Sequence, residues 1–318
     1  MNNSWLDRFI EALYQKYPQR SQLVDNLMSL LSLERESVYR RLRKDVTFPA
    51  EELIKIASAW DISLDEISKF NSKYLDFKLV FIDYLYPSNE DIEYMKNMVS
   101  FISDFKNHSN MEYMEISNRL PRSLTSRFPY LRRYQLLKRT HQYSEYEILP
   151  FSKIFVPEKM STLVLEYITA VKNFKNTVYI WDPLILDDII RDIQYFHSIY
   201  LVSDKEKELI KNDLCALLDY MSEVADKGCW PETSNKVDLY ISNINIQTNY
   251  SYYYSDIFKV FRVHVFAKSE IYTYNPAFIN RFRTWIHFTK AASTLISQAD
   301  LKTKIEFFRK QYELVQTL

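Results

Sequence analysis

The chain contains a single glycine, Gly228, among its 318 residues. Glycine tolerates left-handed backbone and lets backbone amides approach a phosphate group closely. Because a glycine-rich phosphate loop and a dinucleotide-binding fingerprint each need several glycines, the sequence excludes both. It also lacks a flexible glycine-serine linker, so we expect residues 71–86, which join the front of the chain to the rest, to be ordered and helical.

The first seventy residues carry five short helical patterns separated by turns. Ser4 precedes the first, and Pro49 begins the fourth, whose first turn is acidic. The second and third cover residues 23–31 and 34–44, with only a short turn between them. Ser63 begins a capping box that predicts the fifth helix.

The third of these patterns is basic. Val38 and Leu42 lie one helical turn apart and should face the core, so the charged residues must point away from it. The basic residues are Arg35, Arg40, Arg41, Arg43 and Lys44. The pattern therefore predicts a helix with an exposed, strongly positive face.

Residues 4–70 resemble the lambda-repressor-like helix-turn-helix domain, a DNA-binding fold of five short helices. The residues that carry the resemblance are Leu27, Leu31, Leu33, Ser37, Val38, Pro49, Leu53, Ile56, Ala57, Ile62, Ser63 and Leu64. The family usually has a small residue where Met28 stands and glycine where Ser32 stands. A left-handed turn at a residue other than glycine costs roughly 1 kcal/mol, which a folded domain tolerates.

The resemblance implies that the helix beginning near Glu34 enters the DNA major groove. The implied contacts to bases come from Arg35, Glu36, Tyr39 and Arg40, and those to backbone phosphates from Ser37, Arg41, Arg43 and Lys44. Arginine binds guanine with two hydrogen bonds and glutamate accepts one from cytosine, whereas phosphate contacts set affinity without reading sequence. The alternative is that these charges only keep the surface soluble.

Composition frames the rest of the chain. Hydrophobic residues make up 47 % and aromatic residues 16 %, enough for a large core, and the length suggests more than one domain. The formal net charge is zero, so DNA binding has to rest on a local patch. Two cysteines, Cys215 and Cys229, form no disulfide or metal pattern, and no apolar leader or membrane-length run is present. We therefore expect a cytoplasmic protein without a membrane segment or a cofactor.

Beyond residue 74, helical and strand patterns alternate. A capping box at Ser203 begins a long helix that Gly228 ends. Further helices are expected near residues 88–107, 160–174, 184–200, 276–292 and 298–315, and short strands near 112–116 and 177–181. Residues 237–274 predict a meander of three or four antiparallel strands.

The expected fold class is thus mainly α with a small antiparallel β-sheet, an α+β architecture. We expect an N-terminal five-helix domain of residues 1–74. A larger helix-rich α+β domain of residues 75–318 should follow, with strands mainly in 237–274.

Two features of this second part could form a ligand site. Seven basic residues without an intervening acid lie between Arg119 and Arg139, and they include Arg132 and Arg133. They predict either a solvated basic face balanced by acids elsewhere or a pocket for an anionic effector. Tyrosines within 250–254 either stack on a flat ligand or, more commonly, pack across strands.

No catalytic or metal-binding pattern is present. Asp188 and Asp192 share a helix face, but His197 lies about 140° away from it, so a solvated acidic face is favoured over a metal site. The histidines have no adjacent serine or cysteine arrangement, and His264 is expected on the outer face of a strand. We therefore predict that the protein is not an enzyme.

The sequence predicts a sequence-specific transcriptional regulator of prokaryotic type that binds double-stranded DNA as a homodimer, because two half-sites multiply affinity. The C-terminal region would hold the dimer or sense a small-molecule or protein effector. The final helix carries a short heptad seam at Leu301, Ile305, Phe308, Tyr312 and Val315, suited to a dimer contact or to docking on the sheet. The alternatives are a non-enzymatic interaction module that does not bind DNA, and an enzyme with a DNA-binding front end. The latter requires converging titratable groups in a pocket.

Overall fold

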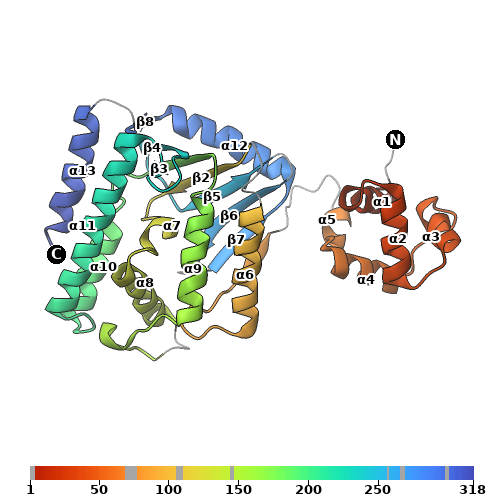
Figure 1. Ribbon diagram of the computed structural model, residues 1–318, viewed down its shortest axis with the longest axis horizontal. Coiled ribbons are helices and arrows are strands. Elements are labelled where there is room, and N and C mark those ends of the chain that lie inside the picture. The colour runs from red at the N-terminus through yellow and green to blue at the C-terminus, as the bar shows by residue number, and fades with distance from the viewer. Residues whose placement is uncertain are drawn as a thin grey trace. The chain divides into compact units, whose positions relative to one another are not determined.

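A computed structural model describes residues 4–68, 77–104, 110–143, 147–255, 258–265, 269–297 and 301–318. The chain divides into two compact units, residues 1–76 (unit 1) and 77–318 (unit 2) (Figure 1). In these described ranges no helix combines the length and the apolar character needed to cross a membrane.

The described part of unit 1 is helical. Its helices are α1 (Trp5–Lys16), α2 (Arg20–Leu31), α3 (Arg35–Leu42), α4 (Ala50–Trp60) and α5 (Leu64–Ser68). They surround one apolar core in which Phe9, Leu27 and Ile56 are fully buried. The cap expected at Ser4 is present, since the Ser4 hydroxyl accepts a hydrogen bond from the Asp7 amide, and the Asp7 side chain completes a capping box.

The turn between α2 and α3 is left-handed at Ser32, with φ 55° and ψ 45°. The Met28 carbonyl accepts from the Ser32 N–H and also from the Leu33 N–H, the latter at 3.2 Å, so both amides of the turn are satisfied at the end of α2. The expected left-handed serine is therefore confirmed. It sets the direction in which the chain enters α3.

Unit 2 is built on a mixed sheet. Its described strands are β1 (Lys78–Val80), β2 (Glu112–Ser117), β3 (Asn176–Trp181), β4 (Lys236–Ser242), β5 (Tyr250–Tyr254), β6 (Lys259–Val265), β7 (Ser269–Thr273) and β8 (Ser293–Leu295). They form one eight-stranded sheet in the order β1-β7-β6-β5-β2-β3-β4-β8. The central strands β2, β3 and β4 run parallel, and the remaining pairs are antiparallel.

The expectation of an α+β class is confirmed, but the expected small antiparallel sheet is wrong in size and sense. Strands β1, β2, β3 and β8 lie outside residues 237–274, and β4 pairs with β3 in parallel. Parallel strands need long crossover connections and burial on both faces. Strands β2, β3 and β4 are separated by some sixty residues each, and nothing in their local sequences indicates that they pair.

Helices cover both faces of the sheet (Figure 1). They are α6 (Asn89–Asp104), α7 (Arg122–Thr125), α8 (Pro129–Gln142), α9 (Glu158–Val171), α10 (Asp187–Ser198), α11 (Asp204–Lys227), α12 (Pro276–Ala291) and α13 (Leu301–Val315). Tyr179 of β3 packs into the larger core, and its neighbours Val178 and Ile180 pack against α12 on the opposite face. This alternation follows from the two-residue period of a strand.

The chain leading into the sheet differs from expectation. Residues 71–86 were expected to be helical, and residues 71–76 lie outside the described ranges. Residues 78–80 instead form β1, which pairs with β7 at the sheet edge. The helical expectation is therefore wrong for that segment, because tertiary strand pairing overrides weak local preference.

Helix α11 ends as the sequence predicts, whereas the buried face of α13 differs from the prediction. Helix α11 begins at the Ser203 capping box and ends at left-handed Gly228, as predicted. On α13, Phe308 and Val315 are buried, but Leu301 and Ile305 are 62 % and 53 % exposed. The buried face is therefore rotated from the expected heptad seam. Lys304 pairs with Asp226, and Gln311 donates to the Pro183 carbonyl, so both lie on the buried side.

The left-handed turn gives a test of unit 1. Ser32→Gly should raise the free energy of unfolding of unit 1 by about 0.5 to 1 kcal/mol, because glycine has no Cβ to strain this conformation. Ser29→Gly, on the exposed side of α2, should lower it by about 0.5 kcal/mol. Urea unfolding of both variants measures the two effects, and equal signs would contradict the assigned turn.

Candidate functional site

Helix α3 presents its charged face to solvent because its apolar face is buried. Val38 is fully buried and Leu42 is 8 % exposed, and both belong to the core of unit 1. On the other side Arg35, Glu36 and Arg40 are exposed. The predicted orientation of this helix is confirmed.

Most of the exposed basic residues already have acidic partners. Arg35 pairs with Asp25 at 2.5 Å, and their side chains are 53 % and 57 % exposed. Arg43 pairs with Glu36 at 2.7 Å and with Asp45 at 3.0 Å, and Lys44 pairs with Asp7. Arg40 is exposed and has no ion-pair partner in the part of the chain that the structure describes. Exposed pairs are weak, so phosphate groups can replace the carboxylates at little cost.

Arg41 differs from the other basic residues of α3. Its Nε and Nη2 donate to the two carboxylate oxygens of Glu52 at 2.6 and 2.7 Å, and its Nη1 donates to the Ser37 carbonyl at 3.2 Å. The Arg41 and Glu52 side chains are only 13 % and 18 % exposed. This two-pronged pair fastens α3 to α4, so Arg41 holds the helix in place.

The two remaining predicted contact residues of α3 are half-buried. The ring of Tyr39 packs on the core of unit 1 and carries the Arg20 guanidinium 5.1 Å above it. Ser37 is partly covered and lies on the helix turn that Arg41 contacts. Arg20 therefore adds a cation next to α3 that the sequence pattern did not single out.

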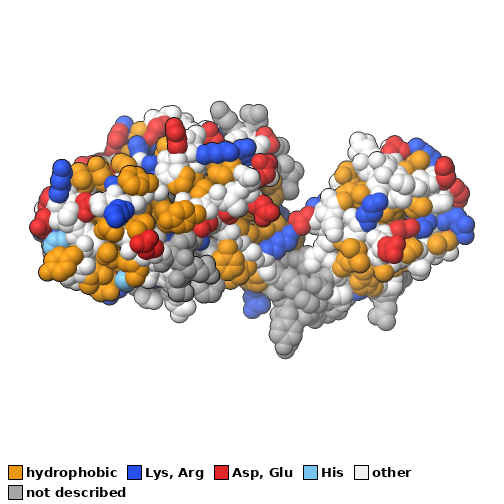
Figure 2. Space-filling model, turned by 90° about the horizontal axis from the view of Figure 1, so that it is seen from below, with side chains coloured by type: hydrophobic (Ala, Val, Ile, Leu, Met, Phe, Trp, Pro, Cys, Tyr) orange, Lys and Arg blue, Asp and Glu red, His pale blue; other side chains and the backbone are white. Residues whose placement is uncertain are grey.

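Unit 1 as a whole is not basic. Residues 1–76 hold eleven lysines and arginines against twelve aspartates and glutamates, a net charge of −1. Figure 2 shows basic and acidic side chains mixed on the visible face of unit 1. Attraction to a polyanion would therefore depend on the local face of α3.

Arg132 and Arg133 lie side by side on α8 but have separate partners. Arg132 donates to the Ser126 carbonyl at 3.1 Å, and burial lowers its pKa. Arg133 donates to the Ser152 carbonyl at 2.6 Å, with its guanidinium over the ring of Phe151. Neither lines the cavities described below.

Acids supplied by other elements balance much of the basic run from Arg119 to Arg139. The pairs are Arg119 with Asp188, Arg127 with Glu232 and Lys138 with Asp192. Asp192 is thus engaged with a lysine, and His197 lies 2.9 Å from Asp204. Among the described residues no group of acids, histidines and cysteines is arranged to hold a metal ion.

A polar cavity of about 220 Å³ lies at the carboxyl end of β2, between α8 and α10. Its charged lining includes the pairs Arg119–Asp188 and Lys138–Asp192, together with Arg122. The carboxyl ends of parallel strands are where open sheets commonly bind ligands. Here the charges are largely satisfied by one another.

Next to this cavity, strands β2, β6 and β7 bury a cluster of titratable groups. Arg262 pairs with Glu270, and both side chains are under 10 % exposed. Glu115 accepts hydrogen bonds from Tyr113 and from Ser123, and burial raises the pKa of its carboxyl group. Such a network is stable only while each member keeps its partners.

His264 belongs to this cluster, so the expectation of an outward-facing His264 is wrong. Its Nδ1 lies 3.9 Å from a Glu270 oxygen. Burial, with the nearby charges of Arg122 and Arg262, lowers the pKa of His264 well below 6.5. The reason for the difference is that helices cover both faces of the sheet, so neither side of β6 is an outer face.

The cluster is the kind of feature that the enzyme alternative requires. The space among its side chains is only about 30 Å³, room for roughly two water molecules. A substrate of ordinary size does not fit beside Glu115. The cluster joins strands and helices, and its members Arg122 and His264 also line the larger polar cavity next to it.

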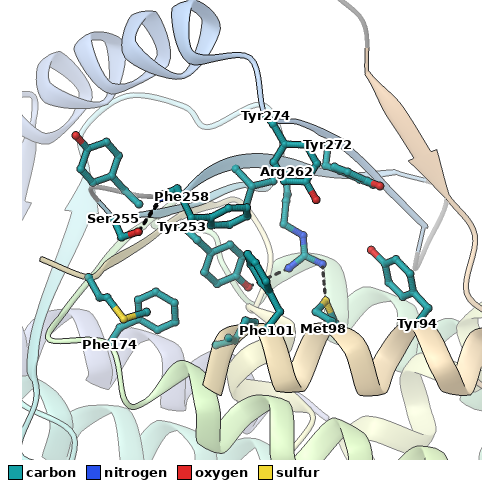
Figure 3. Close-up of a pocket in the computed structure, with 14 residues that line it drawn as sticks. Tyr94, Met98, Phe101, Phe174, Tyr253, Ser255, Phe258, Arg262, Tyr272 and Tyr274 are labelled. Carbon is teal, nitrogen blue, oxygen red and sulfur yellow. Dashed lines mark hydrogen bonds between the residues drawn. The ribbon is translucent and has the colours of Figure 1, made fainter. Parts of the chain in front are cut away.

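A second cavity lies between α6 and strands β5, β6 and β7, and we call it the aromatic pocket (Figure 3). It encloses about 70 Å³. Tyr253 and Tyr254, from the tyrosine run noted in the sequence, both line it. The sequence did not show that Tyr94, Met98 and Phe101 of α6 lie opposite them, because that requires the fold.

No family model, curated protein or solved structure matches this chain. Its function therefore has to be argued from the surfaces described above.

The Arg41–Glu52 pair gives a test of what holds α3. A double-mutant cycle with Arg41→Ala and Glu52→Ala should give a coupling energy of about 1 to 3 kcal/mol in urea unfolding, because the paired charges are largely buried. The same cycle with Arg35→Ala and Asp25→Ala should give less than about 1 kcal/mol, because that pair is exposed. Equal coupling in the two cycles would remove the distinction drawn between Arg41 and its neighbours.

His264 gives a pH test of the buried cluster. Its pKa is lower in the folded chain than in the unfolded chain, so the unfolded state takes up the proton first. Stability should therefore fall as pH drops below 6.5, by at most about 1.4 kcal/mol per pH unit for this one group. Urea unfolding of the His264→Gln variant at several pH values should lack the part of this decrease that comes from His264. A variant with the pH dependence of the original chain would show that His264 titrates normally.

Proposed function

We propose that the protein is a sequence-specific DNA-binding transcriptional regulator that acts as a homodimer. The observation that carries the proposal is the α2–α3 pair: a tight left-handed turn at Ser32, an apolar underside at Val38 and Leu42, and an exposed charged face. A helix held in this way can enter a major groove without unfolding any of its core. In this proposal the protein works in the cytoplasm, because that is where a regulator of prokaryotic type reaches the DNA.

In this proposal four residues contact base edges: Arg35, Glu36, Tyr39 and Arg40. Arg40 is the strongest candidate because it is exposed and has no acidic partner among the residues that the structure describes. Arg35 and Glu36 exchange Asp25 and Arg43 for DNA groups, which is inexpensive at exposed sites. Each good two-bond contact of this kind contributes about 1 to 3 kcal/mol of discrimination.

Ser37, Arg43 and Lys44 contact backbone phosphates in the proposal. Arg41 is assigned a positioning role, since its guanidinium is taken up by Glu52 and the Ser37 carbonyl. The net charge of unit 1 gives little general attraction to DNA. Two protomers on two half-sites would raise both affinity and specificity, with unit 2 holding the dimer or responding to an effector.

One observation favours a second candidate, an interaction module whose front helices bind a protein. Basic residues of α3 are paired with acids, and unit 1 carries slightly more acid than base. In that case duplex DNA would bind weakly, with no preference among sequences.

Substitutions on α3 distinguish these functions. On the preferred duplex, Arg40→Ala and Arg35→Ala should each cost about 1 to 3 kcal/mol of binding free energy and relax preference at one base pair. Lys44→Ala should weaken binding to preferred and random duplexes alike. It should also reduce the slope of log affinity against log salt concentration by the amount expected for about one lost phosphate contact. Fluorescence anisotropy with labelled duplexes at several salt concentrations measures both effects.

Arg309→Ala is the matched control, since Arg309 is an exposed arginine on α13 of unit 2. It should leave binding to both duplexes unchanged. Equal losses for Arg35, Arg40 and Lys44 variants on preferred and random DNA would contradict the assignment of base contacts.

A further inference from the structure

Eight of the fourteen described residues that line the aromatic pocket are aromatic. Phe101 of α6 and Phe258 meet edge to face with ring centroids 4.3 Å apart, and Phe258 meets Tyr274 at 5.6 Å. Tyr272 and Tyr274 are 5.4 Å apart with planes at 75°. A planar ring entering the pocket would find ring edges and faces in the orientations that aromatic pairs prefer.

Two methionines add to this preference. Met98 and Met111 line the pocket, and thioether sulfurs make favourable contacts with aromatic rings. A saturated ring of the same carbon skeleton would gain only the general benefit of apolar burial. The lining should therefore bind a planar aromatic ring more tightly than a saturated ring of the same size.

The pocket carries no uncompensated charge. Arg262 is the one charged residue among its described lining residues, and its side chain extends from the sheet toward α6 (Figure 3). Its Nη2 is paired with Glu270 and lies 3.6 Å from the Met98 sulfur, and its Nη1 donates to the Tyr253 hydroxyl at 2.9 Å. A charged ligand would lose its hydration without gaining a free counter-charge.

Polar hydroxyl groups are nevertheless within the pocket. Figure 3 shows Tyr94 on the opposite side of the Arg262 guanidinium from Phe101 and Tyr253. The Tyr94 hydroxyl is protonated at neutral pH, as in any tyrosine, and burial raises its pKa further, to about 12. One polar substituent on the ligand can therefore be matched inside an otherwise apolar site.

The pocket is open at one side and limited in size. Phe101 and Tyr274 are 38 % and 44 % exposed, whereas Tyr253 is 5 % exposed. Its volume of about 70 Å³ is roughly half that of the apolar protein cavity of about 150 Å³ that binds benzene. The pocket can therefore enclose only part of one ring, and the remainder of the ligand lies at the open side.

We propose that the aromatic pocket binds a small, neutral, planar aromatic molecule of one or two fused rings with a single hydroxyl or ring N–H group. The ligand acts as the effector of the regulator, a role that rests on the proposed function. The polar cavity next to α8 is larger, but its charges pair with one another, and its lining selects no ligand class.

Isothermal titration calorimetry of the full chain tests the site with three probes. The probes are 2-naphthol, its saturated analogue decahydro-2-naphthol, and the anion 2-naphthoate, at pH 7.5. We expect saturable 1:1 binding of 2-naphthol, and binding at least about tenfold weaker for each of the other two, because one lacks planarity and the other carries a charge. Absence of saturable 2-naphthol binding, or equal affinity for the saturated or charged probe, would overturn the proposal.

Alanine variants that remove aromatic rings at the open side test whether 2-naphthol binds in this pocket. Phe101→Ala and Tyr274→Ala should each weaken 2-naphthol binding by about tenfold. Phe288→Ala is the matched control, because Phe288 is a 68 % exposed ring on α12, which packs on the other face of the sheet. Circular dichroism spectra and thermal melting should show that all three variants keep their fold. Unchanged affinity in both pocket variants would place the binding elsewhere and overturn the proposal.

The effector role is measured separately from the site. DNA affinity of the full chain is compared with and without saturating 2-naphthol, and a change of at least about fivefold is expected from a typical coupling between sites. A chain that binds 2-naphthol with unchanged DNA affinity would overturn the effector role alone. A chain that binds 2-naphthol but no DNA would overturn the proposed function and the effector role while the site stands.

Discussion

The burial of Val38 and Leu42 beneath α3 is the interaction on which the front of this protein depends. Because these two side chains face the core of unit 1, the opposite side of the helix, with Arg35, Glu36 and Arg40, faces solvent. The Arg41–Glu52 pair then fixes the helix against α4. A short helix of eight residues is marginal by itself, so its shape comes from these tertiary contacts.

Unit 2 combines a parallel centre with antiparallel edges, and this arrangement explains its unusual interior. Covering both faces of the sheet buries Glu115, Arg262 and Glu270 among tyrosines and leaves the neighbouring His264 side chain only 21 % exposed. The strands β5, β6 and β7 also bring the tyrosine run opposite α6 and create the aromatic pocket. Both features arise from the sheet order, which places segments far apart in sequence side by side.

Local signals in the sequence predicted local structure well. A few neighbouring residues are enough to predict the helix cap at Ser4, the capping box at Ser203, the left-handed residues Ser32 and Gly228, and the buried side of α3. The pairing of β2 with β3 and the inward position of His264 could not be predicted in this way, because they depend on contacts over long sequence separations. The partners of Arg35 and Arg41 were missed for the same reason. The sequence of a basic helix does not indicate which acidic residues from elsewhere in the chain will pair with it.

The central claim is that α3 enters DNA. Selection of duplexes from a random-sequence library by the full chain tests it most directly, because the method presupposes no target. If α3 enters DNA, we expect enrichment of a short motif with two-fold symmetry, with half-sites about one helical turn apart. A library that stays random after repeated rounds at low salt would contradict it.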